Sequence, residues 1–175
     1  MSMRDRYFRS FQSIVFKRGF YKAHYMAAYK ANLIYSIVLA VLSFACITIW
    51  SISKTQPIFW ALIIGLAQLA QAFASFLPWS EQLCGLKYLM PELETLIIDM
   101  ATEWANIDIQ AYDDLKIQEK ITEFDSRFCR LENQYVGTIF FSESKKYTNE
   151  AERTMTDYLK LRYCQIQKEE VAIDA

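Results

Sequence analysis

Two apolar stretches decide the fold of this chain: residues 31–53 read ANLIYSIVLAVLSFACITIWSIS, and residues 57–78 read PIFWALIIGLAQLAQAFASFLP. Neither contains a charged residue or His, although the 175-residue chain has 19 Lys and Arg and 20 Asp and Glu. A helix rises about 1.5 Å per residue, so 22 residues reach about 33 Å, enough to cross a hydrocarbon core about 30 Å thick. The sequence therefore predicts two membrane-spanning helices and is not typical of a soluble globular domain.

Aromatic residues flank both predicted spans, as they do at membrane interfaces. Trp50 and Trp60 lie near the loop that joins the spans, and Trp79 lies at the opposite end of the pair. Pro57 suits the first position of the second helix, where its missing N–H costs nothing. We expect a tight transmembrane hairpin over residues 31–80.

The basic residues predict the orientation of this hairpin. The first 30 residues hold seven Lys and Arg residues against Asp5 alone, whereas the loop between the spans has only Lys54. Basic residues concentrate on the cytoplasmic side of membrane helices. We therefore expect a multi-pass protein of the inner (cell) membrane with both termini in the cytoplasm.

Residues 1–30 form an arm in which aromatic and basic side chains alternate. This composition suits an amphipathic helix that lies in the headgroup layer and contacts membrane lipid. The residues expected at the lipid interface, besides the three tryptophans above, are Arg4, Arg6, Arg9, Lys17, Arg18 and Lys22. Nucleic-acid binding uses a similar composition and is the alternative. His24, the single His of the chain, has no partner for metal or general-base chemistry, and we expect it to titrate at the surface.

Residues 81–175 carry 11 basic and 19 acidic residues and show helical periodicity. Two apolar stripes recur at helical spacing: Leu93, Leu96, Ile97, Met100, Trp104 and Ile107, and then Ile117, Ile121, Phe124, Phe128, Leu131 and Tyr135. Asp113 or Asp114 suits the start of the second helix, and Gly137 suits its end. A third helix is expected from Asn149. We expect an all-α cytoplasmic domain whose stripes pack against each other, with oligomerisation as their alternative use.

The sequence lacks the common catalytic and metal-binding motifs. It has no GxxxxGK[ST] loop, no HExxH and no Gly-rich dinucleotide turn. No pair of its four Cys residues has metal-ligand spacing, and Ser-His-Asp catalysis would rest on His24 alone. We therefore expect no enzyme, no metal site and no cofactor.

The order of these elements resembles the SLATT family, the SMODS and SLOG associating two-transmembrane effector domains of bacteria. The resemblance rests on the adjacent spans at 31–53 and 57–78 and on the stretch from Trp79 to Trp104. It implies a pore-forming or membrane-disrupting effector of a bacterial antiphage system, coupled to a nucleotidyltransferase or a nucleotide-sensing partner. It transfers no binding residue, because the family offers no motif to match.

Three function classes fit these features. The first is a regulated pore or ion channel of this effector type, and its main alternative is a membrane anchor or scaffold whose cytoplasmic helices recruit a partner protein. The third is a different small oligomeric channel or an accessory subunit. Two helices cannot enclose an aqueous path, so a pore requires a homo-oligomer, which we take as a tetramer. An oligonucleotide ligand would need a basic site, whose candidates are Arg127, Arg130, Lys145, Lys146 and Arg153. The ordinary role of these residues is to pair with neighbouring Asp and Glu.

A rotation of about 100° per residue gathers small and polar residues on one arc of the second span. The pore-lining or inter-helix candidates on this arc are Gly65, Gln68, Gln71, Ala72 and Ser75. Leu62, Leu66 and Leu69 lie on the opposite side and suit lipid. An unpaired amide in hydrocarbon costs several kcal/mol, so Gln68 must face water or another helix. It either lines a pore or joins helices by hydrogen bonds. On the first span, Ser36, Ala40 and Ser43 suit close packing within the hairpin.

Overall fold

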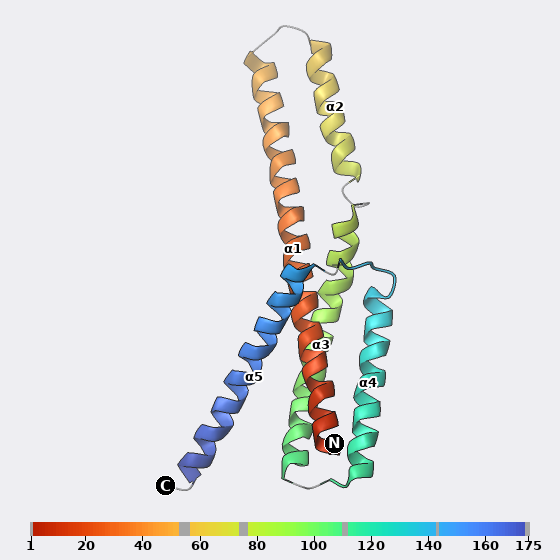
Figure 1. The fold of residues 1–175 in the computed structure, drawn as a ribbon. Coiled ribbons are helices and arrows are strands. Elements are labelled where there is room, and N and C mark those ends of the chain that lie inside the picture. Colours follow the sequence, from red (N-terminus) through yellow and green to blue (C-terminus); the bar gives the residue numbers. More distant parts are fainter. Residues whose placement is uncertain (1, 53–56, 74–76, 110–111, 143, 174–175) are drawn as a thin grey trace. The chain divides into compact units, whose positions relative to one another are not determined.

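The computed structural model describes residues 2–52, 57–73, 77–109, 112–142 and 144–173, and their side chains except at 46, 47, 49–52, 57–60, 78 and 162–173. This part of the chain contains helices and no strand (Figure 1). The helices are α1 (Met3–Ile52), α2 (Pro57–Phe73), α3 (Pro78–Asp108), α4 (Asp114–Val136) and α5 (Lys145–Ile173). The all-α prediction is confirmed for the described residues.

The chain divides into two compact units. Unit 1 comprises Met1–His24 and Gly85–Ala175, and unit 2 comprises Tyr25–Cys84. The helices α1 and α3 contribute residues to both units. The division at residue 24 differs from the sequence-based boundary at residue 30, because the start of α1 belongs to the same unit as α4 and α5.

The N-terminal part of α1 is a core helix of unit 1. Figure 1 shows this part of α1, in red, beside α3 and α4. Tyr7 is fully buried, and its hydroxyl donates to the Met100 carbonyl of α3 at 2.8 Å. Its ring stacks on Trp104 of α3, with centroids 6.0 Å apart, and meets the Phe124 ring of α4 edge-on at 6.3 Å. One tyrosine therefore joins three helices.

The interfacial arm is the part of the predicted fold that is wrong. Its aromatic residues do not form a lipid-facing surface, since Tyr7, Phe11 and Tyr21 are 0–6% exposed. They share one helix face with Ile14, which is also buried, and this face fills the space between the apolar stripes of α3 and α4. Burial among protein side chains removes these rings from any contact with headgroups.

α4 follows its sequence prediction closely. Asp113 is the N-cap, and its carboxylate accepts a hydrogen bond from the Asp114 amide at 2.8 Å. The helix ends at Val136 and is followed by Gly137. Its buried residues are Ile117, Ile121, Phe124, Phe128, Leu131 and Val136. Because this stripe packs inside unit 1, it is not available for the oligomerisation that the sequence left open.

α5 packs antiparallel along the start of α1. Its first turn places the Tyr147 ring 4.2 Å from the His24 ring, between centroids. Further along α5, a Cβ at Gly19 would lie 3.0 Å from the Cα of Ala151, so the two backbones cross closely here. α5 begins at Lys145, four residues before the predicted start.

Unit 2 pairs the second part of α1 with α2. The Tyr35 hydroxyl donates to the Ala70 carbonyl at 2.6 Å, and the Tyr35 ring meets the Trp79 ring at 6.1 Å. The predicted packing face on α1 is wrong in part: Ser36 and Ala40 are exposed, and the half-buried positions are Asn32, Tyr35, Leu39 and Ser43.

The α3–α4 crossing at Gly85 gives a test of this packing. We expect Gly85→Ala to lower the free energy of unfolding by about 1–3 kcal/mol relative to Gly65→Ala, because overpacking costs this amount. A Cβ at Gly85 would overlap the Tyr135 carbonyl oxygen and lie 2.8 Å from Ile139 Cδ1, whereas a Cβ at Gly65 would meet nothing within 4 Å. Both changes bring the same gain in helix propensity. Thermal unfolding in detergent, followed by far-UV circular dichroism, measures the difference, and equal midpoints would contradict this packing.

Candidate functional site

α1 contains the strongest membrane signal of the described residues. The segment Met3–Ala45 is long and apolar enough to cross a membrane, with a mean hydropathy of 1.5 in its most apolar 18-residue window. Only 6% of this window is buried, whereas the core helix of a soluble protein is mostly buried. The exposed apolar side chains include Leu33, Ile34, Ile37, Val38, Val41, Leu42 and Phe44. Such a contiguous apolar surface indicates membrane association.

α2 is an apolar helix within the predicted second span. It has 17 described residues, Pro57–Phe73, and its described apolar segment is Ala61–Phe73. Residues 74–76 of the predicted span 57–78 lie outside the described residues. The chain starts a new helix, α3, at Pro78, which suits the first position of a helix.

Exposure divides α2 into three faces. Ile63, Ala67 and Ala70 are half-buried and lie on the face that Tyr35 contacts. Leu62, Leu66, Leu69 and Phe73 form an exposed apolar face. The candidates Gly65, Gln68, Gln71 and Ala72 are exposed on the remaining face. Ser75, the fifth candidate of this face, lies outside the described residues.

The polar face of α2 has no partner for its two amides within the described part of the chain. No side-chain hydrogen bond joins Gln68 or Gln71 to any residue described there. Around Gly65 there is open space, since an added Cβ would meet nothing within 4 Å. The structure therefore brings these candidates together on one surface and leaves that surface uncovered within this part of the chain.

Three of the basic residues predicted at the lipid interface are engaged inside unit 1. Arg4 donates to the Ile107 carbonyl at 3.0 Å and to the Asp108 carbonyl at 3.4 Å, at the end of α3. Such a cation is favourable where helix carbonyls are unpaired. Two more contacts join α1 to carboxylates: Lys17 to Glu132 of α4 at 3.4 Å, and Arg18 to Glu94 of α3 at 2.5 Å.

The other residues predicted at the interface differ in their surroundings. Arg6, Arg9 and Lys22 are exposed on α1. Trp79 is half-buried against Tyr35, and its indole N–H is buried without a hydrogen-bond partner among the described residues. The side chains of Trp50 and Trp60 lie outside the described residues.

The candidates for an anionic ligand do not gather at one described site. Arg127 pairs with Asp99 of α3 at 2.8 Å, which is the ordinary role for such a residue. Arg130, Lys145, Lys146 and Arg153 are exposed and line neither of the two cavities described below. Arg127 is therefore part of a salt bridge and not of a phosphate-binding site in the described residues.

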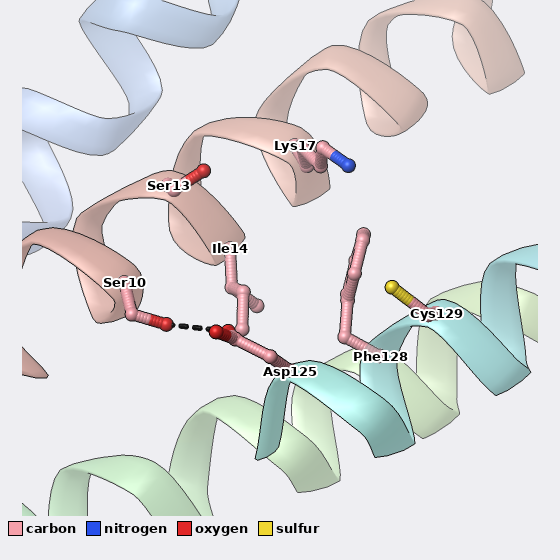
Figure 2. Close-up of a pocket in the computed structure, with 7 residues that line it drawn as sticks. All are labelled: Ser10, Ser13, Ile14, Lys17, Asp125, Phe128 and Cys129. Atoms are coloured by element: carbon pink, nitrogen blue, oxygen red, sulfur yellow. Dashed lines mark hydrogen bonds between the residues drawn. The ribbon is translucent and has the colours of Figure 1, made fainter. Parts of the chain in front are cut away.

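A cavity of about 340 Å³ lies between α1 and α4 (Figure 2). It is lined by Ser10, Ser13, Ile14, Lys17, Asp125, Phe128 and Cys129. The Ser10 hydroxyl donates to the Asp125 carboxylate at 2.7 Å. The Lys17 ammonium lies 4.4 Å from the centre of the Phe128 ring and also pairs with Glu132. Ser10, Asp125 and Lys17, three of the polar residues of this cavity, thus all have a partner.

A second cavity, of about 250 Å³, lies between α3 and α4. Its charged groups are also paired: Lys120 contacts Glu103 at 3.4 Å and Glu123 at 3.0 Å, and Arg127 contacts Asp99. In neither cavity do the described hydrogen bonds join a nucleophile, a base and a third group that orients the base. Among the described residues there is also no cluster of His, Cys, Asp and Glu that would hold a metal ion.

Sequence reasoning missed the surroundings of His24. The prediction that it titrates at the surface is wrong, because the side chain is 5% exposed. Aromatic rings surround it, with centroids at 4.6 Å for Phe20, 5.2 Å for Phe141 and 4.2 Å for Tyr147. Its Nε2 atom is buried without a partner among the described residues. The signal in the sequence was the aromatic residue Phe20, one helical turn earlier.

Comparisons of the chain with family models, with curated proteins and with solved structures return no match. The membrane association of α1 and the arrangement of side chains above therefore carry the functional argument.

The contact between α1 and α4 around Glu132 gives a test of the buried arm. Tyr21 donates its hydroxyl to Glu132, and the pKa of Tyr21 lies above its ordinary value because of burial and of this hydrogen bond. We expect Tyr21→Phe to lower the free energy of unfolding by about 1.5–3 kcal/mol, the usual contribution of a hydrogen bond to a charged group.

Tyr25→Phe is the matched control, since the Tyr25 hydroxyl has no hydrogen-bond partner in the described part of the chain. Chemical unfolding of both variants in detergent measures the difference. If Tyr21→Phe were as stable as Tyr25→Phe, the arm would not pack on α4 as described.

Proposed function

We propose that the protein is a pore-forming membrane effector, in which several copies bring the polar faces of their α2 helices together. One observation carries this proposal: Gln68 and Gln71 lie exposed on an otherwise apolar helix, beside the open space at Gly65. The proposal includes two spans, the part of α1 from residue 31 onward and α2 with the apolar residues that follow it in the sequence.

The energetics of an amide in hydrocarbon support association of several copies. An unpaired amide costs several kcal/mol there, and the described part of one chain offers no partner to Gln68 or Gln71. Ala61, Gly65 and Ala72 are small, so a helix of a second copy can approach this face closely. In such an assembly the glutamines face each other or an aqueous path. Four copies remain our expectation for the number.

The biological setting of the proposal rests on the resemblance to the SLATT family. In that setting the hairpin lies in the inner membrane of a bacterium, and both termini and unit 1 lie in the cytoplasm. Ion flow through the oligomer would stop the growth of a phage-infected cell. A nucleotidyltransferase product or a nucleotide-sensing partner would trigger the opening.

The role of a membrane anchor is the second candidate function, and one observation favours it. Arg127, the first of the five candidates for an anionic ligand, pairs with Asp99 of the same chain, and the other four do not gather at a described cavity. A protein partner that contacts the acidic helical surface of unit 1 would not need a free basic residue there. The experiments below separate the two functions.

The topology is the first consequence to test. In a variant whose only cysteine replaces Thr55, we expect an impermeant maleimide to label intact cells, because the loop faces outward. A variant that retains only Cys129, an exposed residue of α4, should be labelled after permeabilisation and not before. Labelling of Cys129 in intact cells would reverse the orientation.

The role of the polar face of α2 is the second consequence to test. We expect the double variant Gln68→Leu, Gln71→Leu to reduce ion flux at least tenfold in vesicles that contain the purified protein, because the hydrogen bonds of the two amides are lost. Membrane insertion should not change, since leucine is more apolar than glutamine. Release of an entrapped ion-sensitive dye measures the flux.

The matched control for this experiment is Leu66→Ile, Leu69→Ile, on the exposed apolar face of α2. It changes the same number of residues without adding or removing a polar group, and we expect normal flux. Native mass measurement in mild detergent accompanies both variants. Absence of flux from the unaltered protein, together with a monomer in several detergents, would overturn the pore and favour the anchor.

A further inference from the structure

His24 lies where three segments of unit 1 meet. It belongs to α1, it contacts Phe141 in the connection between α4 and α5, and it contacts Tyr147 in the first turn of α5. The side chain is 5% exposed, and its Nε2 atom is buried without a hydrogen-bond partner among the described residues. The surrounding aromatic rings accept a neutral imidazole as one more ring, and water does not reach it to solvate a charge.

The contact at His24 is one of several described contacts between α5 and α1. Two others are the close approach of Gly19 and Ala151 and the ring contact of Phe11 and Tyr158, whose centroids are 6.3 Å apart. The three pairs follow a single antiparallel register along the two helices. The exposed surface of the remaining described part of α5 includes Leu161, so α5 is not enclosed by other helices there. A helix that packs along one face in this way can open locally without unfolding the rest of the unit.

We propose that His24 is a proton-sensitive latch, which holds α5 and the α4–α5 connection on α1 at neutral pH and releases them when it is protonated. An imidazolium in this place would be a buried charge among aromatic carbons. Moving α5 and Phe141 away gives the charge access to water, which is the lowest-cost response of the fold.

No opposite charge compensates an imidazolium within the described residues. The titratable side chains tied to this cluster are Tyr147 on α5, Tyr21 on α1 and Glu132 on α4, and Glu132 is already engaged by Tyr21 and Lys17. The connection contributes Phe141 and Ser142, which do not titrate in this range. The pKa of His24 is lowered by burial, and a backbone hydrogen bond with Ser142 opposes this shift in part.

The direction of the pH effect follows from the lowered pKa. A His whose pKa is lower in the docked state than in the released state binds fewer protons when docked. Docking is therefore at full strength above the released pKa of about 6.5 and weakens as the pH falls below it. Between pH 7.5 and pH 5.5 the docking equilibrium is expected to shift toward release by up to about tenfold. His24 is the single His of the chain, and no other side chain has an ordinary pKa in this range.

Spin labels on α1 and α5 test the latch in the full chain. Arg9 and Lys160 are exposed and occupy matched positions in the antiparallel register. They are replaced by labelled cysteines in a background in which the four native cysteines are serine, and the protein is kept in detergent. We expect a single narrow distance distribution at pH 7.5 and a second, longer and broader population at pH 5.5. The distance measurement does not depend on ion flux, so it tests the latch independently of the proposed pore.

Two variants calibrate the measurement. In His24→Phe the added ring carries no titratable group, and we expect the docked distance at both pH values. In Gly19→Val the side chain meets the backbone of Ala151, and we expect the released population at both pH values, which defines its distances. An unchanged distribution in the unaltered protein from pH 7.5 to 5.5 would overturn the latch, as would a pH response that persists in His24→Phe.

A third variant addresses the carboxylate that follows Ser142 in the sequence. Glu143 lies outside the described residues, and Glu143→Gln removes its charge without altering His24. We expect the pH response to remain in Glu143→Gln. Loss of the response in this variant would move the titrating group from His24 to Glu143 and overturn the proposal.

Discussion

The structure depends on one long helix, α1, whose two parts have different surroundings. Its first residues, Tyr7 among them, fill the core of unit 1, whereas its second part exposes apolar side chains such as Leu33 and Ile37. An α-helix pairs its own backbone hydrogen-bond groups, so it can continue from a protein core into hydrocarbon without leaving these groups unsatisfied. The sequence changes only the side chains along this helix. The rest of unit 1 is arranged so that Tyr7 and its neighbours are covered.

Charge pairing explains why the basic start of the chain and its acidic remainder belong together. Lys17 and Arg18 contact carboxylates on α4 and α3, and Arg127 contacts one on α3. Partly exposed ion pairs of this kind each contribute about 0–1 kcal/mol, so burial of the aromatic residues, not the charges, holds the arm in place. The pairs instead favour one register of α1 over others. In these pairs the basic groups of Lys17, Arg18 and Arg127 contact carboxylates of the same chain instead of a lipid headgroup or a nucleotide.

The sequence predicted those features of the fold that local signals decide. The cap at Asp113, one of the two predicted positions, and the end of α4 before Gly137 are confirmed, and so is the apolar stripe up to Leu131, whereas Val136 is buried in place of the predicted Tyr135. The arm was not predicted, because aromatic and basic residues alternate both in a helix on a membrane surface and in a core helix with a basic outer face. The spacing of Tyr7, Phe11 and Ile14 fits both. Only the covering helices, far away in the sequence, decide between them.

The candidate site was predictable to the same extent. Helical rotation alone places Gln68 and Gln71 on one arc, but it does not say which arc of α2 the first span covers. The contact of Tyr35 with Ala70 answers this, because it assigns α1 to a different face and leaves both amides uncovered within the described residues. For His24 the sequence offers only Phe20, one helical turn earlier, because the two other rings that enclose it, Phe141 and Tyr147, lie more than a hundred residues away.

The three faces of α2 have different requirements in hydrocarbon. Its half-buried face packs on α1, and in the proposed second span its leucine face would be satisfied by lipid. The face of Gln68 and Gln71 is satisfied by neither, and the cost of leaving it so is several kcal/mol for each amide. Association of several chains relieves this cost whether the amides bond to each other or to water. A pore and an anchor built on this hairpin would therefore share the same oligomeric contact. They differ only in whether helices that meet at Gly65 and Gln68 leave room for water between the glutamines.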